Sequence, residues 1–287
     1  MFLMECQKRA SEMSELHLWL TMFRFTREQV EELTELIGLD DHFVAPCGYA
    51  IEPMCQPFQP SPIPSSISDM IDVPTCFNLM RTTSAPTHAV KARGAPLACC
   101  VGFFDGTVRS ICRPSKNQKY CYSGHKRKHG LKFQSVVTPN WIIAHLFGPI
   151  PASRHDAFML SRSNLLREAR SVLAADGKHF VFYGDPAYGK QDHILCPFKG
   201  ASFSTEQDLF NGQMSSVRVC VEWAFGWLTR YWAFCDFAKN QKLYLQSVGK
   251  LYAVAAILTN VHACYDGNQT SEFFQVAPPC IREYLHT

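Results

Sequence analysis

The sequence predicts an α/β fold in which helices flank a mixed β-sheet, preceded by an N-terminal region that is partly irregular. Short apolar segments rich in β-branched and aromatic residues alternate with longer segments of helical periodicity. Their order from residue 96 onward is strand, hairpin, helix, strand, helix, helix. A hairpin pairs antiparallel, whereas a strand that follows a crossover helix can pair parallel, so the sheet is expected to be mixed.

The N-terminal region divides into a helical part and an irregular part. Thr26 can cap a short amphipathic helix whose first turns are acidic and whose apolar stripe is formed by Val30, Leu33 and Leu36. The segment from Glu52 to Lys91 carries seven of the seventeen prolines. We therefore expect little regular structure in that segment.

Two strands and a hairpin follow. The run "PLACCVGFFDGTV" predicts a strand that ends at Asp105, and "LKFQSVVT" with "WIIAHLFG" predicts a hairpin turning at "PN". A helix is expected to start near Asp156. The run "KHFVFYGDP" predicts a short buried strand that also ends in an aspartate, Asp185.

Two helices complete the predicted order. After a loop from Gly189 to about Gln213, "SSVRVCVEWAFGWLTRYWAF" predicts a helix capped by Ser215 or Ser216. The run "LQSVGKLYAVAAILTNVHACY" predicts a further, largely buried helix.

Basic residues are concentrated in one part of the chain, although the net charge is only +3. No Asp or Glu occurs between Gly106 and His155. A segment of this kind attracts a phosphate-bearing partner, and a solvated basic loop is the alternative. The basic residues in it are Arg109, Arg113, Lys116, Lys119, Lys126, Arg127, Lys128, Lys132 and Arg154.

The cysteines and the apolar runs indicate the cellular compartment in which the protein is expected. The thirteen cysteines form no CxxC pair, and an odd count does not suggest a disulfide framework, so reduced thiols in an intracellular protein are expected. The first twenty residues include acids where a signal peptide needs an apolar run. No run approaches the ~18 apolar residues of a membrane span, so we expect no membrane association.

Three carboxylates occupy positions that packing alone would not favour. Asp105 and Asp185 each end a predicted strand, and Glu222 has apolar and aromatic neighbours in "VCVEWAFGW". Each has a simpler explanation: an Asp-Gly turn, a cap before Pro186, and an ion pair with Arg218 four residues earlier. Together, two strand ends at one sheet edge and a crossing helix can form an oxygen site for two Mg²⁺ or Mn²⁺ ions.

Five blocks of sequence resemble a known family. The runs "GFFDGTVRSICRP", "YSGHKRKHGLKFQSVV", "GPIPASRHDAFML", "YGDPAYG" and "SSVRVCVEWAFGWL" are similar in order and spacing to the DDE domain of PIF/Harbinger transposases and Harbinger transposase-derived nucleases. The resemblance covers about residues 102–264. It implies an RNase H-like fold in which Asp105, Asp185 and Glu222 bind two divalent cations, Mg²⁺ or Mn²⁺, and cut or join DNA.

The resemblance also suggests residues around the triad. Asp156 lies in the family block "RHDAFML", and we expect it and His155 near the site, with a helix cap and a surface histidine as the alternatives. The phosphate contacts are expected from the basic segment, at Arg109, Lys126, Arg127 and Lys128.

The first hundred residues depart from the family pattern. The proline-rich segment stands where the family has a helix-turn-helix, so site-specific DNA binding is not expected from it. A deletion, a changed reading frame or mispredicted exons would each explain this difference. We divide the chain into a helical remnant (1–51), an irregular segment (52–95), the nuclease domain (96–265) and a C-terminal tail (266–287).

The leading hypothesis is a metal-dependent DNA endonuclease or transposase. One alternative is a decayed or domesticated relic that binds DNA or protein without chemistry, and another is an RNA-directed nuclease on the same fold. DNA as the partner implies the nucleus, with the cytoplasm as the alternative, and the family implies a Myb-like DNA-binding partner.

Overall fold

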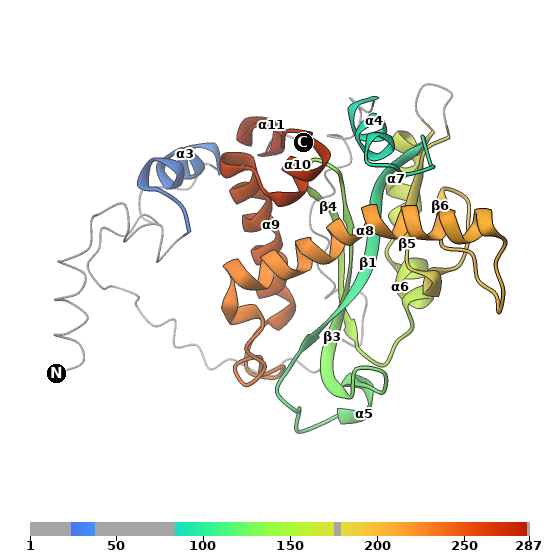
Figure 1. Ribbon diagram of the computed structural model, residues 1–287. Helices are drawn as coiled ribbons and strands as arrows, with labels where there is room; N and C mark the ends of the chain where they lie inside the picture. The colour runs from blue at the N-terminus through green and yellow to red at the C-terminus, as the bar shows by residue number, and fades with distance from the viewer. Residues whose placement is uncertain (1–23, 38–83, 175–178, 286–287) are drawn as a thin grey trace.

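The computed structural model of the chain describes residues 24–37, 84–174 and 179–285. Within them a six-stranded mixed sheet lies between two layers of helices (Figure 1). The predicted α/β class is confirmed, and the arrangement is RNase H-like. In chain order the strands are β1 (Cys100–Ser110), β2 (Tyr122–Ser123), β3 (Lys128–Val137), β4 (Ile143–Pro151), β5 (Val181–Gly184) and β6 (Ile194–Leu195).

Strand β1 lies at the centre of the sheet. It pairs antiparallel with β3 on one side and parallel with β5 on the other, and β5 pairs parallel with β6. Strand β4 pairs antiparallel with β3, which confirms the predicted hairpin. The parallel strand β5 follows the crossover through α6 and α7, so the mixed sheet arises in the way that the element order predicts.

The helices differ in length from a single turn to more than seven turns. Among the described residues, no helix combines the length and apolar character needed to cross a membrane. The α-helices are α3 (Arg27–Ile37), α4 (Ser84–Ala92), α5 (Gln118–Cys121), α6 (Asp156–Arg162), α7 (Leu165–Leu173), α8 (Thr205–Tyr231), α9 (Val248–Asp266), α10 (Gln269–Phe274) and α11 (Ile281–Leu285), and two 3₁₀ turns are η4 (Pro186–Tyr188) and η5 (Ala233–Cys235).

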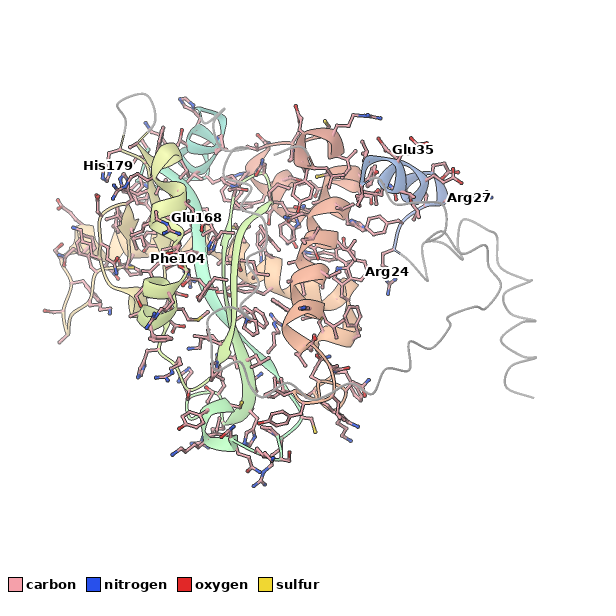
Figure 2. All side chains as sticks on the ribbon, turned by 180° about the vertical axis from the view of Figure 1, so that it is seen from behind. Arg24, Arg27, Glu35, Phe104, Glu168 and His179 are labelled. Atoms are coloured by element: carbon pink, nitrogen blue, oxygen red, sulfur yellow. The ribbon has the colours of Figure 1, made fainter. Side chains whose placement is uncertain are left out.

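Successive side chains of a strand point to opposite faces of the sheet, so the core has two layers. Phe103 and Tyr183 are buried in the layer that contains α8 and α9. Phe104 and Phe182 are buried in the opposite layer, which contains α7. Figure 2 shows Phe104 on the side of the sheet where α6 and α7 lie. The first layer also takes in Leu33 of α3 and residues of α10 and α11, so both described ends of the chain join one core.

The N-terminal predictions are partly corrected. Helix α3 is confirmed, and Thr26 and Gln29 bond reciprocally to each other's backbone N–H groups as a capping box. The prediction of scarce regular structure is wrong at the end of the proline-rich segment, where α4 forms and packs on β1. Its proline, Pro86, lies in the first turn, where a missing N–H costs nothing. The rest of that segment, residues 52–83, lies outside the described residues.

Two helix boundaries also differ from prediction. Helix α8 starts about ten residues before the predicted caps, because Ser204 and Gln207 form a capping box there. The helix predicted from Asp156 is two helices, α6 and α7, and Asn164 between them has a left-handed backbone with φ 51°.

Candidate active site at the end of strand β5

Asp105 and Asp185 lie at the same level of two adjacent strands. Strand β5 ends just before Asp185, whereas β1 continues past Asp105. The parallel pairing ends at Phe104 with Gly184, and Asp185 follows directly. Strand β1 goes on to pair with β3 as far as Ser110. The prediction that Asp105 ends its strand is therefore wrong, and so is the alternative of an Asp-Gly turn. It is the neighbouring strand that ends, and this places the two carboxylates at the same step of the sheet.

Gly106, the residue after Asp105, permits a close approach to β1. A Cβ atom on this residue would lie 2.9 Å from Asp156 Oδ1 and 2.9 Å from the Tyr188 hydroxyl. A glycine inside a strand often marks such a close approach. Asp156 of α6 and Tyr188 of η4 are therefore held against the central strand at Gly106, on the face opposite the one where Asp105 meets α8.

Helix α8 contributes a cation and a carboxylate to the same place. Arg218 Nη1 lies 3.2 Å from Asp105 Oδ2, and its Nη2 lies 3.3 Å from Glu222 Oε1. The Arg218 side chain is only 17% exposed, so its charge is poorly screened by water. Sequence reasoning expected the pair with Glu222 but missed the one with Asp105, which joins residues 113 positions apart.

Glu222 is not the buried acid that its neighbours in the sequence suggest. Its side chain is 56% exposed. The helical period turns Val221, Ala224 and Phe225 into the core and leaves Glu222 on the outer face of α8. The burial that the apolar and aromatic neighbours of Glu222 in the sequence suggested is therefore wrong. Its place in the site rests on its closeness to Arg218 and Asp105.

The pKa of Asp105 shows that the carboxylates act on each other. Burial raises the pKa of this carboxyl to about 6, while Arg218 and the Gly106 N–H lower it. The negative charges of Asp185 and Glu222 both raise it further. The structure thus brings together the three acids that the sequence singled out, with Asp105 at their centre.

Asp185 serves the local backbone as well as the cluster. It caps the 3₁₀ turn η4, and its Oδ1 accepts a hydrogen bond of 2.7 Å from the Ala187 N–H. The cap predicted as the simpler explanation is present. Since that bond fixes the side chain at the end of β5, it also positions the carboxylate beside Asp105.

Asp156 lies at this site, whereas the side chain of His155 lies on the surface. Asp156 is the first residue of α6, and its Oδ1 accepts from Lys132 Nζ at 3.1 Å instead of capping the helix. His155 precedes it as the N-cap residue, its side chain is exposed and it makes no cap hydrogen bond. Asp156, which was expected near the site, thus lies against β1 at Gly106 and pairs with Lys132.

Tyr188 is a site residue that sequence reasoning missed. Its side chain is 3% exposed and its hydroxyl has no hydrogen-bond partner among the described residues. Burial raises its pKa far above the usual value, and the charges of Asp156, Asp105 and Asp185 add to this effect. Buried hydroxyls are normally bonded, so an orphan among carboxylates indicates a missing partner. The signal available in the sequence was its place three residues after Asp185.

The donor atoms at this place fit a hard divalent cation. The groups are carboxylates and hydroxyls, and no nitrogen or sulfur ligand is required. The orphan Tyr188 hydroxyl, held in its neutral form, can donate to a carboxylate or to a cation-bound water. Asp105, Asp185 and Glu222 are the residues that could hold Mg²⁺ or Mn²⁺. Among the described residues their donor oxygens do not all lie within 4.8 Å of one another, and Arg218 is paired with two of them, so these side chains would have to move to bind an ion.

The predicted phosphate contacts occupy two different environments. Lys126, Arg127 and Lys128 are exposed at the turn that leads into β3. Seven residues separate Lys128 from Ser135, the partner of Asp105, which at about 3.3 Å per residue is roughly 23 Å. The basic turn therefore flanks the acids at a distance instead of lining them.

Arg109 is not available as a surface contact. Its side chain is 12% exposed and lies over the ring of Tyr252, with Asp236 3.7 Å away. It also donates to Thr107 Oγ1 at 3.0 Å. The guanidinium is used inside the protein, so we remove Arg109 from the set of phosphate contacts.

Comparison with known proteins identifies the region that contains the site. A family model described as DDE superfamily endonuclease matches residues 104–260, which is more than half of the 287 residues. The matched span contains the carboxylates Asp105, Asp156, Asp185 and Glu222. None of the curated proteins and none of the solved structures matches the chain.

The raised pKa of Asp105 predicts a pH-dependent effect of removing its charge. A raised pKa in the folded state means that the wild-type protein loses stability as the pH rises from about 4 through about 6. In EDTA at pH 8, Asp105→Asn should therefore be more stable than the wild type by about 3 kcal/mol, and nearly equal to it at pH 4. Thermal unfolding between pH 4 and pH 8 measures this.

The matched control is Asp208→Asn, an exposed acid in the first turn of the same helix that carries Arg218. It should show no such pH-dependent gain. An Asp105→Asn variant that is less stable than the wild type by the same amount at every pH would mean that the ion pair with Arg218 outweighs burial.

Proposed function

The chain belongs to the DDE superfamily endonucleases, and from this membership we propose that it cuts or transfers DNA phosphodiesters with two divalent cations. The observation that carries the proposal is the convergence of Asp105, Asp185 and Glu222 from two strands and a helix. Arg218 offsets the charge of Asp105 and Glu222, but burial and the neighbouring carboxylates still raise the pKa of Asp105. The arrangement is useful if a cation is to be bound.

Asp105, Asp185 and Glu222 are proposed to hold Mg²⁺ or Mn²⁺. Two such ions, when bound, supply the charge that activates a water or a 3′ hydroxyl and stabilises the leaving oxygen. Asp105 provides the most buried carboxylate, and Asp185 is oriented by its bond to the Ala187 N–H. Glu222 is exposed and lies where substrate would approach.

Arg218 and Tyr188 are proposed to position groups around these acids. The Arg218 guanidinium contacts Asp105 and Glu222, so it lies where a scissile phosphate would be, and guanidinium groups bind phosphate oxygens well. Burial and the surrounding carboxylates keep the Tyr188 hydroxyl protonated. Toward a carboxylate or phosphate oxygen it therefore acts as a hydrogen-bond donor. Asp156 is paired with Lys132 and supports the position of Tyr188.

The basic turn is proposed to bind the DNA backbone beside the cut. Lys126, Arg127 and Lys128 are exposed, and the roughly 23 Å along β3 is less than one turn of duplex. One duplex can therefore contact the basic turn and the acids together. This gives affinity without sequence preference.

The finer assignments extend the same proposal. From the resemblance of the five sequence blocks we infer that the chain is of the type of the PIF/Harbinger transposases or the nucleases derived from them. DNA as the substrate implies action in the nucleus, and a Myb-like DNA-binding protein would supply the target recognition that a lost helix-turn-helix no longer provides.

A plasmid-nicking assay tests the catalytic proposal. With Mg²⁺ or Mn²⁺ the wild type should convert supercoiled plasmid to open circle. Asp185→Asn keeps the size and the capping oxygen but removes the charge, so its rate should fall by about a hundredfold or more, since the metal contributes several kcal/mol to the transition state. Asp208→Asn, the exposed control on α8, should nick like the wild type.

Three outcomes would contradict the proposal. Equal nicking by the wild type and Asp185→Asn would exclude the metal site. Salt-dependent DNA binding with no nicking in either metal would favour the alternative of a binding module. Duplexes of the same sequence in DNA and RNA should give cleavage of DNA, and cleavage of RNA alone would favour an RNA-directed nuclease.

The role of the basic turn predicts a change in salt dependence. Replacing Lys126, Arg127 and Lys128 with Gln should lower the slope of log affinity against log salt by about 0.9 for each phosphate that the turn no longer neutralises. The control replaces the exposed Lys91, Lys239 and Lys250 with Gln, which removes the same charge. It should leave the slope near its original value. Fluorescence anisotropy with a labelled duplex measures both. An equal decrease of the slope in the two variants would mean that only net charge matters.

A further inference from the structure

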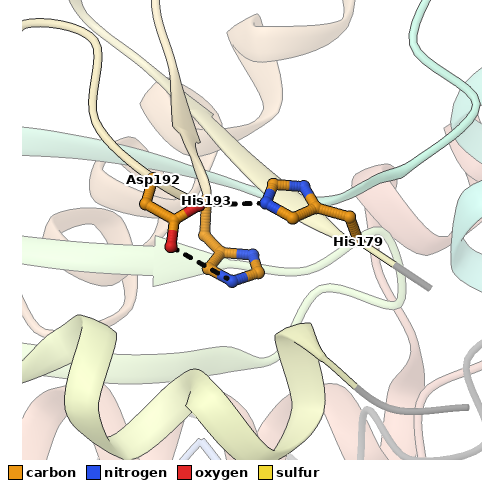
Figure 3. A group of neighbouring side chains, drawn as sticks. All are labelled: His179, Asp192 and His193. Carbon is orange, nitrogen blue, oxygen red and sulfur yellow. Dashed lines mark hydrogen bonds and ion pairs between the residues drawn. The ribbon is translucent and has the colours of Figure 1, made fainter. Parts of the chain in front are cut away.

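A second group of metal-ligand side chains lies at the other end of β5 from the carboxylates. His179 lies just before β5, and Asp192 and His193 lie just before β6. Strands β5 and β6 are parallel neighbours, so residues that precede them meet at one edge of the sheet. Figure 3 shows the Asp192 carboxylate reaching both imidazole rings.

The donor atoms of the three side chains lie near one another. One ligand atom from each lies within 4.8 Å of the others. His179 Nε2 is 3.0 Å from Asp192 Oδ1, and His193 Nε2 is 3.8 Å from Asp192 Oδ2. The two imidazole rings are stacked with their centroids 4.1 Å apart. The donor set is two imidazole nitrogens and one carboxylate.

The tautomer of His193 is determined by its second nitrogen. His193 Nδ1 lies 2.7 Å from the carbonyl oxygen of Phe180, and a carbonyl only accepts, so Nδ1 must donate. In the neutral ring Nε2 then carries a lone pair that faces the Asp192 carboxylate. Two lone pairs facing each other are unfavourable unless a proton or a cation lies between them. A histidine that donates its other nitrogen to a backbone carbonyl is also the usual arrangement of metal ligands.

We propose that His179, Asp192 and His193 form a transition-metal site for which Zn²⁺ is the best ion. Imidazole with carboxylate suits Zn²⁺ and is a poor match for Mg²⁺, which prefers oxygen alone. Tetrahedral zinc needs donor atoms about 3.3 Å apart. His193 is held in place at 14% exposure, while the side chains of His179 and Asp192 are 61% and 80% exposed and can turn inward.

The position of the proposed zinc site implies a structural role. The ion would tie the start of β6 to the start of β5, and β6 is a two-residue edge strand with little pairing of its own. The connection between these strands carries Asp185 and Tyr188. Zinc at this edge would therefore close the loop that presents them, without being a ligand of the carboxylate cluster.

The test measures zinc binding by the full chain with the carboxylate cluster neutralised. In a background of Asp105→Asn, Asp185→Asn and Glu222→Gln, with excess Mg²⁺ present, calorimetry should show one Zn²⁺ per chain. Co²⁺ should give visible absorption bands typical of nitrogen and oxygen ligands, without a thiolate charge-transfer band. At a hundredfold excess over Kd, Zn²⁺ should raise the Tm by about 5 °C.

Single substitutions identify the ligands. His179→Ala, His193→Ala and Asp192→Asn should each weaken zinc binding at least tenfold and reduce the Tm shift. Asp192→Asn changes an exposed side chain and keeps its size, so its result does not depend on folding. His125→Ala, which removes an exposed histidine from the β2–β3 turn, is the control and should bind zinc like its parent.

The proposal is overturned by either of two results. One is no zinc binding in the neutralised background. The other is unchanged affinity in the His193→Ala and Asp192→Asn variants, which would place the metal elsewhere. In both cases the three side chains would be an ordinary hydrogen-bonded group, and the nuclease proposal would be unaffected because it involves other residues.

Discussion

The contact of Arg218 with Asp105 is the interaction on which the candidate active site depends. It joins the central strand to helix α8 across 113 positions of sequence, and through Glu222 it links a third acid to the pair. Burial raises the pKa of Asp105, and Arg218 opposes this, so that the net value is about 6 and the carboxyl is mostly charged at neutral pH. Arg218 provides a positive charge beside it, and a bound divalent ion would provide a stronger one. Metal binding and this ion pair are therefore alternatives for one carboxylate.

The fold supplies the geometry around that contact. Strand β5 ends one residue before Asp185, whereas β1 continues through Asp105, so the two carboxylates meet inside the sheet instead of at a free edge. Gly106 has no side chain, which lets Asp156 and Tyr188 approach from α6 and η4. The same strand β5 begins at the histidine cluster and ends at the acids, so one short strand connects both proposed metal sites.

Local patterns in the sequence were enough for the fold class. The hairpin β3–β4 and the helix stripe of α3 follow from side-chain periodicity, which depends only on neighbouring residues. The position of Asp105 inside a strand could not be predicted, because it depends on where a different strand stops. The start of α8 was missed because the cap at Ser204 lies ten residues before the apolar part of the helix.

Burial was the property that sequence reasoning judged least well. Arg109 seemed a surface cation and is packed on Tyr252, whereas Glu222 seemed buried and is exposed. Both depend on which face of an element meets the core, and a single local run does not determine this. Tyr188 and the histidine cluster were missed for a related reason, since their partners are brought together only by the parallel pairing of strands.

The central claim is that the acids around Asp105 bind divalent metal in place of Arg218. Crystals of the full chain grown with Mn²⁺ and a DNA duplex, measured at the manganese absorption edge, test it directly. The account predicts anomalous density between Asp105 and Asp185, with Arg218 turned away from Asp105. Arg218 still paired with Asp105 and no anomalous density at the acids would contradict it.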